Sequence, residues 1–126
     1  MWTSDFLEID GIKYNLPVKT DVTRNFDLLD KYAKRTDNGY LKRKLIGVYK
    51  NYQMNFAEQT VQNYDEYNRL VDKLTEPVDF HTVKIGNYTF RCYISSVGDT
   101  LYKYKEGKEY YKNLSAKFTA EGPWRS

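Results

Sequence analysis

The chain has little cysteine and little histidine, and this scarcity excludes several classes of protein. Cys92 is the only cysteine and His81 the only histidine among 126 residues. A single cysteine cannot form an intramolecular disulfide, so the chain is not a small secreted disulfide scaffold, and we expect it to fold in a reducing cytosol. A zinc site would need further histidine or cysteine ligands, so the sequence predicts no metal site and no cofactor.

Long apolar runs are also lacking. The N-terminal residues MWTSDFLEIDG have neither the basic start nor the apolar core of a signal peptide, and no stretch has the length of a transmembrane helix. Glycine-rich phosphate loops, internal repeats and low-complexity linkers are missing as well. We therefore expect one domain spanning residues 1–126, without a membrane anchor or a small-molecule substrate.

Catalytic chemistry has one conceivable pair of residues, Cys92 and His81, placed across a predicted hairpin. In strand register His81 shares a face with Val83 and Ile85, which favours a packed histidine over a catalytic one. The sequence therefore predicts that the protein is not an enzyme.

Aromatic residues, in contrast, are abundant. The chain contains thirteen tyrosines, and aromatic residues make up 17 % of it, which is more than a disordered chain carries. Tyrosine joins an apolar face to a polar tip, so it suits half-buried sheet faces and wet interfaces alike. A β-rich domain with aromatic cross-strand pairs is the simpler interpretation, and a dedicated aromatic binding face is the alternative.

One helix is predicted at about residues 64–75. Its apolar stripe, repeating at steps of three and four, consists of Tyr67, Leu70, Val71 and Leu74. A stripe this narrow should pack on a sheet. We expect Asn63 to be the N-cap with Glu66 as its capping-box partner, and Pro77 to end the helix. The carboxylates expected on its solvent side are Asp65, Glu66, Asp72 and Glu76.

Short strands separated by turn signals surround this helix. Asp10-Gly11, Gly86-Asn87 and Glu106-Gly107-Lys108 each predict a β-hairpin. Another strand is predicted over residues 45–56, with its even-numbered positions facing the core and Lys50 interrupting that row. The sequence therefore predicts an α+β domain, mainly an antiparallel β-sandwich or partly open barrel with one packed α-helix.

Residues 23–44 stand out because the pattern fades there. We expect an edge strand over about residues 18–26, then a long loop over about residues 27–41 with a turn at Asp37-Asn38-Gly39. Connections of this length without secondary structure are uncommon in compact domains and are usually functional or disordered. Aromatic residues and arginine dominate the energetics of interfaces. The predicted contact residues are Lys34, Arg35, Tyr40, Lys42 and Arg43, with Trp2 and Trp124 as anchors near the termini.

The run Lys42-Arg43-Lys44 has three interpretations. Beside Tyr40 and Tyr49 it could contact phosphates and stack on a base. It could also be a strand start exposed to water, or a contact to a neighbouring subunit. Basic residues here and acidic residues on the helix would suit head-to-tail contacts between identical copies, or simply solvate two faces. The net charge of +3 is mild for a nucleic-acid binder, so nucleic acid is not the expected partner.

Several motifs in order resemble one group of proteins. The chain opens with LEIDGIKY before Pro17, and a polar stretch ending at Gly39 leads into Lys42-Arg43-Lys44-Leu45. Then follow YDEYNRLVDKL, EPVDFHTVKI, FRCYISSVGDT and an ending of the form Leu114-Ser115-x-x-Phe118. This order resembles small proteins encoded in the tail-gene modules of phages and prophages of Gram-positive bacteria.

The resemblance implies a non-enzymatic structural component of a tail tube or baseplate. Its partners would be other copies of itself or other tail proteins, and it would reside in the virion tail after synthesis in the host cytoplasm. The alternative function is a small basic module that binds single-stranded nucleic acid.

Overall fold

The computed structural model describes residues 6–19, 21–35, 39 and 41–125, and the side chains of these residues except 29–35 and 41–46. Its elements, in chain order, are β1 (Leu7–Ile9), β2 (Ile12–Tyr14), β3 (Thr23–Arg35), β4 (Leu41–Asn55), α1 (Tyr64–Leu74), β5 (His81–Ile85), β6 (Tyr88–Lys105) and β7 (Lys108–Ala120). The chain is thus mostly antiparallel β-sheet with one helix, as the sequence predicts. No helix in the described ranges has the length and apolar character needed to cross a bilayer.

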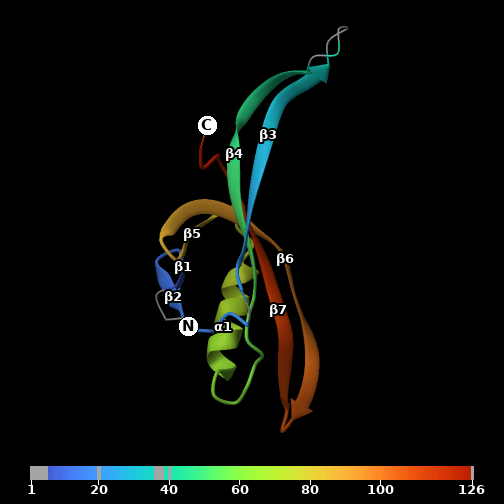
Figure 1. The fold of residues 1–126 in the computed structure, drawn as a ribbon. Helices are drawn as coiled ribbons and strands as arrows, with labels where there is room; N and C mark the ends of the chain where they lie inside the picture. Colours follow the sequence, from blue (N-terminus) through green and yellow to red (C-terminus); the bar gives the residue numbers. More distant parts are fainter. Residues whose placement is uncertain (1–5, 20, 36–38, 40, 126) are drawn as a thin grey trace.

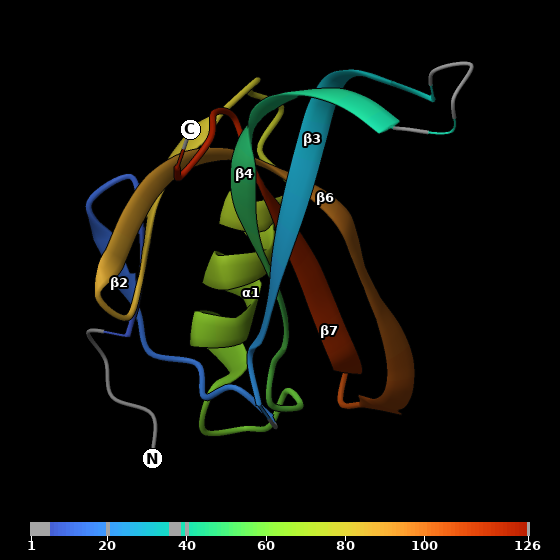
Figure 2. The same ribbon diagram turned by 45° about the horizontal axis from the view of Figure 1, so that its top comes forward.

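The seven described strands form one sheet in the order β2-β1-β5-β6-β7-β4-β3, and every neighbouring pair is antiparallel. The sheet is open, with β2 and β3 at its edges, and it curves around α1 (Figure 1, Figure 2). The expected sandwich is not confirmed, because the described strands make no second sheet. Register shifts in β6 around Gly98 mark β-bulges, which strengthen the local twist and so help the sheet to curve.

Three tight turns form at the predicted positions. Asp10-Gly11 has φ of 52° and 84°, and Glu106-Gly107 has φ of 55° and 77°. Two successive residues with positive φ are the mark of a type I′ turn, whose twist matches that of the flanking strands. In Gly86-Asn87 only Gly86 has a positive φ, 61°, as a type II′ turn requires.

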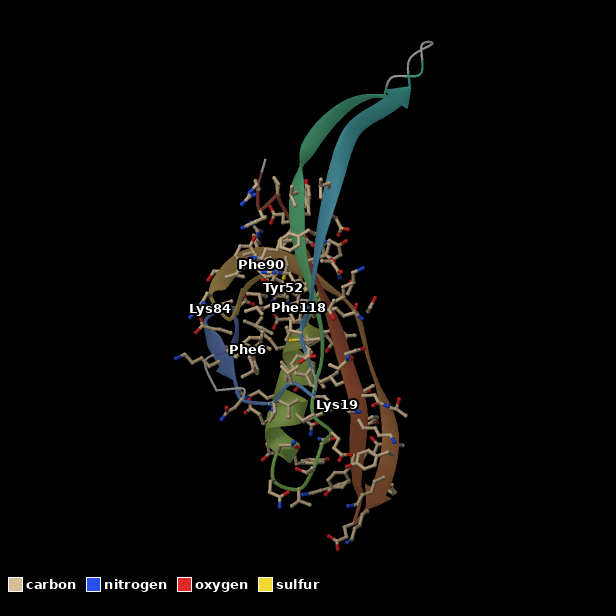
Figure 3. All side chains as sticks on the ribbon, viewed as in Figure 1. Phe6, Lys19, Tyr52, Lys84, Phe90 and Phe118 are labelled. Atoms are coloured by element: carbon tan, nitrogen blue, oxygen red, sulfur yellow. The ribbon has the colours of Figure 1, made fainter. Side chains whose placement is uncertain are left out.

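Helix α1 lies on the concave face of the sheet (Figure 2), and its apolar stripe belongs to the same core as the strand residues. Tyr67, Leu70 and Leu74 are buried, as predicted. The strand residues buried with them include Tyr52, Met54, Phe56, Phe90, Leu114, Ala116 and Phe118. Tyr52, Phe90 and Phe118 come from three strands and meet in the middle of the body (Figure 3). One core therefore joins the helix to both halves of the sheet.

The predicted capping box is wrong. Asn63 precedes the helix, but its Oδ1 accepts a hydrogen bond from the Thr60 N–H at 2.6 Å and its Nδ2 donates to the Glu58 carbonyl at 3.0 Å. Glu66 is half-buried, where it accepts a hydrogen bond from the backbone N–H of Asn15. Asn63 therefore closes the preceding loop, because its short amide reaches nearby backbone groups more readily than the helix end.

The expected loop over residues 27–41 is also wrong. β3 continues through Arg35 and β4 begins at Leu41, and the two strands pair from Thr23 opposite Gln53 to Arg35 opposite Leu41. Residues 36–38 and 40, which include most of the predicted turn, lie outside the described residues, and Gly39 has a φ of 90°. The expected edge strand is displaced too, since Val18 makes only an isolated bridge and β3 begins at Thr23.

The pattern fades in this hairpin for a physical reason. β4 pairs with β7 only over residues 52–55, so among the described strands residues 41–51 pair with β3 alone, apart from an isolated bridge between Val48 and Arg125. A strand alternates apolar and polar residues when one of its faces is buried against other elements. Without a further strand beside it, most of the hairpin has no need of that alternation.

Candidate functional site

The β3–β4 hairpin leaves the body of the sheet as an arm (Figure 1). We define the arm as residues 25–35 and 41–51, the part of the hairpin beyond the pairing of β4 with β7. A two-stranded hairpin on its own is marginally stable in water. Its outer strand, β3, is also an edge of the whole sheet and presents unpaired backbone groups. The arm is therefore the part of the fold best suited to contact another molecule.

Asn51 fixes the point where the arm separates from the body. Its side chain is buried on β4, where Oδ1 accepts a hydrogen bond from the Ala120 N–H at 2.8 Å. Its Nδ2 donates to the Asp27 Oδ2 at 2.7 Å. One amide thus links β4 to both of its neighbours where the strand pairing with β7 ends, and it holds the direction in which the arm leaves.

Residues 122–125 support the arm along the other side of β4. The Val48 N–H donates to the Arg125 carbonyl at 2.7 Å, and the Trp124 N–H donates to the Val48 carbonyl at 2.8 Å. This pairing requires Gly47, because a Cβ there would lie 2.8 Å from the Pro123 Cβ and 2.9 Å from the Arg125 carbonyl oxygen. Glycine permits this close approach of two backbones.

Trp124 docks on the arm within a surface that combines aromatic rings and cations. Its ring centroid lies 5.4 Å from that of Phe26, and Arg125 and Lys50 lie over it at 4.3 Å and 5.0 Å. Arg24 lies over the Phe26 ring at 4.8 Å. We call Arg24, Phe26, Lys50, Trp124 and Arg125 the basal patch. Trp124, one of the predicted anchors, remains 38 % exposed, so part of its ring is accessible to a partner.

The other predicted contact residues belong to the arm or lie outside the described residues. Lys34 and Arg35 are in β3, and Lys42 and Arg43 are in β4, where Lys34 is in register with Lys42. The structure thus brings these four basic positions to one end of the arm. Their side chains lie outside the described residues, as do Tyr40 and Trp2 entirely.

Sequence reasoning missed most of the basal patch. Apart from the predicted anchor Trp124, the signal is Lys50, a cation in the inward-facing row of β4. In the structure Lys50 is 9 % exposed, and its ammonium lies over the Tyr88 ring at 4.1 Å. Burial, and secondarily the charge of Arg24, lowers the pKa of Lys50. The aromatic rings that accommodate Lys50 come from distant parts of the chain, so the strand pattern alone treats it as an interruption.

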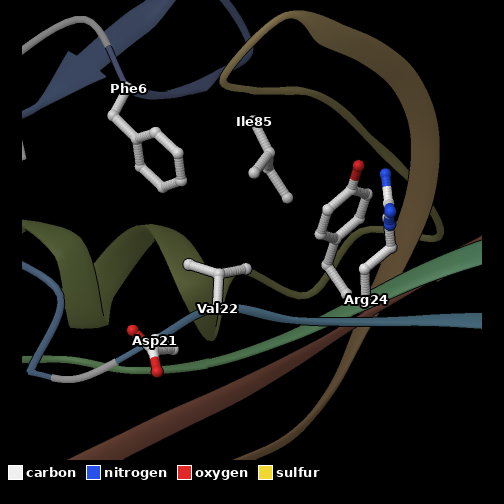
Figure 4. Close-up of a pocket in the computed structure, with 6 residues that line it drawn as sticks. Phe6, Asp21, Val22, Arg24 and Ile85 are labelled. Carbon is white, nitrogen blue, oxygen red and sulfur yellow. The ribbon is translucent and has the colours of Figure 1, made fainter.

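A groove of about 600 Å³ borders this patch. It lies between the two ends of the curved sheet, with Phe6 and Ile85 on one side and Val22 and Arg24 on the other (Figure 4). Arg24 therefore belongs to both the groove and the basal patch.

The structure also brings the two residues considered for catalysis opposite each other. His81 and Cys92 are in register on β5 and β6, and the His81 Nδ1 is 2.7 Å from the Asp10 Oδ2. Cys92 is fully buried, and burial together with the charge of Asp10 raises the pKa of its thiol to about 12. A protonated, buried thiol is a poor nucleophile. His81 is buried beside Val83, as expected of a packed histidine.

A cluster with metal-ligand atoms surrounds the same histidine. One ligand atom each from Asp10, Glu76 and His81 lies within 4.8 Å of the others. The Lys73 Nζ, however, is 3.1 Å from the Asp10 Oδ2 and 3.4 Å from the Glu76 Oε2. An ammonium already neutralises these carboxylates and would repel a divalent cation. The arrangement is that of an ion-pair network fastening the β1–β2 turn to β5 and α1.

Comparison with known proteins assigns the chain to no family: no protein-family model matches it, and no curated protein does. Functional reasoning therefore rests on the residues and the fold.

Proposed function

We propose that this protein is a non-enzymatic structural component of a phage or prophage tail, of the tail-tube or baseplate type. It assembles with other copies of itself or with other tail proteins through the β3–β4 arm. The observation that carries the assembly role is the arm itself. β4 stays paired with β3 as far as Leu41 but with β7 only over residues 52–55. The assignment to a tail is supported by the order of sequence motifs.

The two edges of the sheet differ in a way that supports this role. Monomeric β-proteins protect their edges with short strands, prolines or covering segments. β2 is three residues long, whereas β3 has thirteen residues, no proline, and exposed apolar side chains at Phe26 and Leu28. β3 does carry charged residues and an irregular register around Asp30, but its length leaves an edge to which a strand from another molecule can be added. We therefore assign assembly to β3 and not to β2.

The partly open barrel is part of the same proposal. The curvature of the sheet around α1 supports it (Figure 2). A partner strand added at β3 in an assembly would extend the curved sheet towards such a barrel.

An arm-shortening variant tests the proposal. Residues 30–46 are replaced by Asn-Gly, so that Leu29 and Gly47 flank a two-residue turn. The backbone N–H and C=O of Val48 bond to residues 124–125, away from β3. Because the two kinds of pair alternate along an antiparallel ladder, the next pair, Leu29–Gly47, is hydrogen-bonded across the hairpin. A type I′ turn can close a pair of this kind.

The full-length chain should form rings or arrays at high concentration, seen by sedimentation velocity and electron microscopy, or bind a co-expressed tail protein. The shortened variant should remain folded and associate more weakly, because it loses the edge of β3 beyond Leu29. Glu106→Asn, at the tip of the other long hairpin, is the control and should assemble normally. A full-length chain that stays monomeric and binds no tail protein would contradict the proposal.

The alternative, binding of single-stranded nucleic acid, is favoured by one observation. Three lysines lie over tyrosine rings on and beside the β6–β7 hairpin, as the pairs Lys103–Tyr110, Lys108–Tyr64 and Lys112–Tyr102. Basic groups beside aromatic rings are what single-strand binders use. The same pairs also count against the alternative, because the chain's own cations occupy the ring faces on which bases would stack. Salt-sensitive binding of a labelled oligonucleotide would favour it, and no binding at low salt would exclude it.

A further inference from the structure

Three cations of the basal patch have no acidic partner among the described residues. Arg24 and Lys50 lie on the face of the β3–β4 hairpin that carries the core residue Tyr52, and Arg125 joins them from the C-terminal segment. Their charged groups lie over aromatic rings. A cation that loses water without gaining a carboxylate is unfavourable, and Lys50, at 9 % exposed, is the clearest case.

Exposed apolar surface accompanies these cations. Phe26 is 40 % exposed and Leu28 is 52 % exposed, and Trp124 lies beside Phe26. Tryptophan and arginine are the residues most enriched at the energetic centres of protein interfaces. The basal patch therefore has the composition of a docking surface for a partner that carries negative charge.

The same chain exposes an acidic surface of the required kind. Asp65 and Asp72 are seven residues apart, hence on one side of α1, and both are exposed. Neither forms an ion pair with a described residue, whereas the nearby Glu66 pairs with Arg69. We call Asp65 and Asp72 the acidic face of α1. No ion pair joins this face to the basal patch within the described part of the chain.

We infer that the basal patch of one copy docks the acidic face of α1 of a second copy. The inference rests on the proposed function, because it names the partner surface within the same assembly. The two surfaces are different, so the contact is head-to-tail and repeats from copy to copy, giving a ring or an open filament. In this contact the carboxylates reach the exposed Arg24 and Arg125, and the second copy covers Phe26 and Trp124.

Reciprocal charge reversal tests the contact. Arg24→Glu/Arg125→Glu reverses the exposed cations of the patch, and Asp65→Lys/Asp72→Lys reverses the acidic face. Each variant alone should associate at least about tenfold more weakly than wild type in sedimentation velocity at low salt. An equimolar mixture of the two should regain association, because the reversed patch of one then meets the reversed face of the other.

The controls separate this inference from its alternatives. Lys105→Glu/Lys117→Glu makes the same charge change elsewhere and should associate like wild type. Arg24→Gln/Arg125→Gln removes the two charges without reversing them and should also weaken association. It therefore tests the contact even if the charge-reversed variant folds poorly. If the patch variants associate like wild type, or if mixing restores nothing, the inference is overturned. The proposed function still stands in that case, provided that the wild-type chain assembles. Absence of wild-type assembly overturns both.

Discussion

Replacing Asp10 with asparagine should destabilise the protein at neutral pH and do so much less in acid. The Asp10 carboxylate accepts a hydrogen bond from the Thr82 N–H at 2.9 Å and lies 2.7 Å from the His81 Nδ1 and 3.1 Å from the Lys73 Nζ. Asparagine has the same shape and tolerates the positive φ that Asp10 adopts in its type I′ turn. The substitution therefore keeps the turn conformation, removes the charge and replaces one acceptor oxygen with an NH₂ donor.

The magnitude follows from the pKa of the Asp10 carboxyl. Partial burial would raise this pKa, but hydrogen bonds from His81, Thr82 and Lys73, with the charge of His81, lower it from 3.8 to about 2. That difference corresponds to about 2.4 kcal/mol of unfolding free energy. Because the side chain is 34 % exposed, solvent screening reduces the expected loss to about 1–2 kcal/mol.

The sign of the pH dependence is fixed. A carboxyl whose pKa is lower in the folded state stabilises the fold above its unfolded-state pKa, and this contribution disappears as the pH falls through the folded-state pKa. The difference between wild type and Asp10→Asn should therefore be complete at pH 7 and about half as large at pH 3.

Urea unfolding at both pH values, followed by circular dichroism, measures this difference. Asp21→Asn, which removes an exposed carboxylate without an ion pair among the described residues, is the matched control. A difference for Asp10→Asn that is below about 0.5 kcal/mol at pH 7, or that stays constant down to pH 3, would refute the reasoning.

Three further substitutions or reactions probe the base of the arm and the core. Gly47→Ala should loosen residues 122–125, because the new Cβ would clash with them, and should lower the free energy of unfolding by about 1–3 kcal/mol. We expect the fluorescence of Trp124 to shift to longer wavelength. Asn51→Ala should lower the free energy of unfolding in urea by about 2–3 kcal/mol, because a buried N–H of β7 loses its acceptor. Cys92 should resist a disulfide reagent at pH 8 in the folded protein and react quickly in urea, because burial keeps its thiol protonated.

The chain supplies controls for these measurements. In a Trp2→Phe background Trp124 is the only tryptophan, so its emission can be read alone. Asn55→Ala, at an exposed position on the same strand as Asn51, should change stability by less than about 0.5 kcal/mol. Unchanged fluorescence in Gly47→Ala, full stability in Asn51→Ala, or immediate reaction of Cys92 would each contradict the corresponding structural account.

The elements that depend on neighbouring residues could be predicted from the sequence. The bounds of α1 follow from its apolar stripe, and the turn at Asp10-Gly11 from the conformations that these residue types tolerate. The buried face of β7 follows from alternation, since Leu114, Ala116 and Phe118 are all buried. In each case the signal and the structure lie within a few residues of one another.

The features that depend on distant contacts could not be predicted. Trp124 meets Phe26 from the other end of the chain, and Asp10 finds His81 only because β1 pairs with β5. Lys50 reads as an interruption of a strand because its aromatic neighbours lie on other elements. The arm was expected to be a loop because pairing between two strands alone leaves little alternation in sequence.

Strand β6 has a consequence for how the body unfolds. Residues 88–92 pair with β5, and from Cys92 onward the same strand pairs with β7. The two pairings overlap only at Cys92, so β6 has a strand on one side over most of its length, and the halves of the sheet are coupled by the core they share, which includes Tyr52, Phe90 and Phe118. Amide hydrogens in β5 and β7 should then exchange through one common opening reaction, as members of a single foldon. A destabilising substitution in either half would thus accelerate exchange in both.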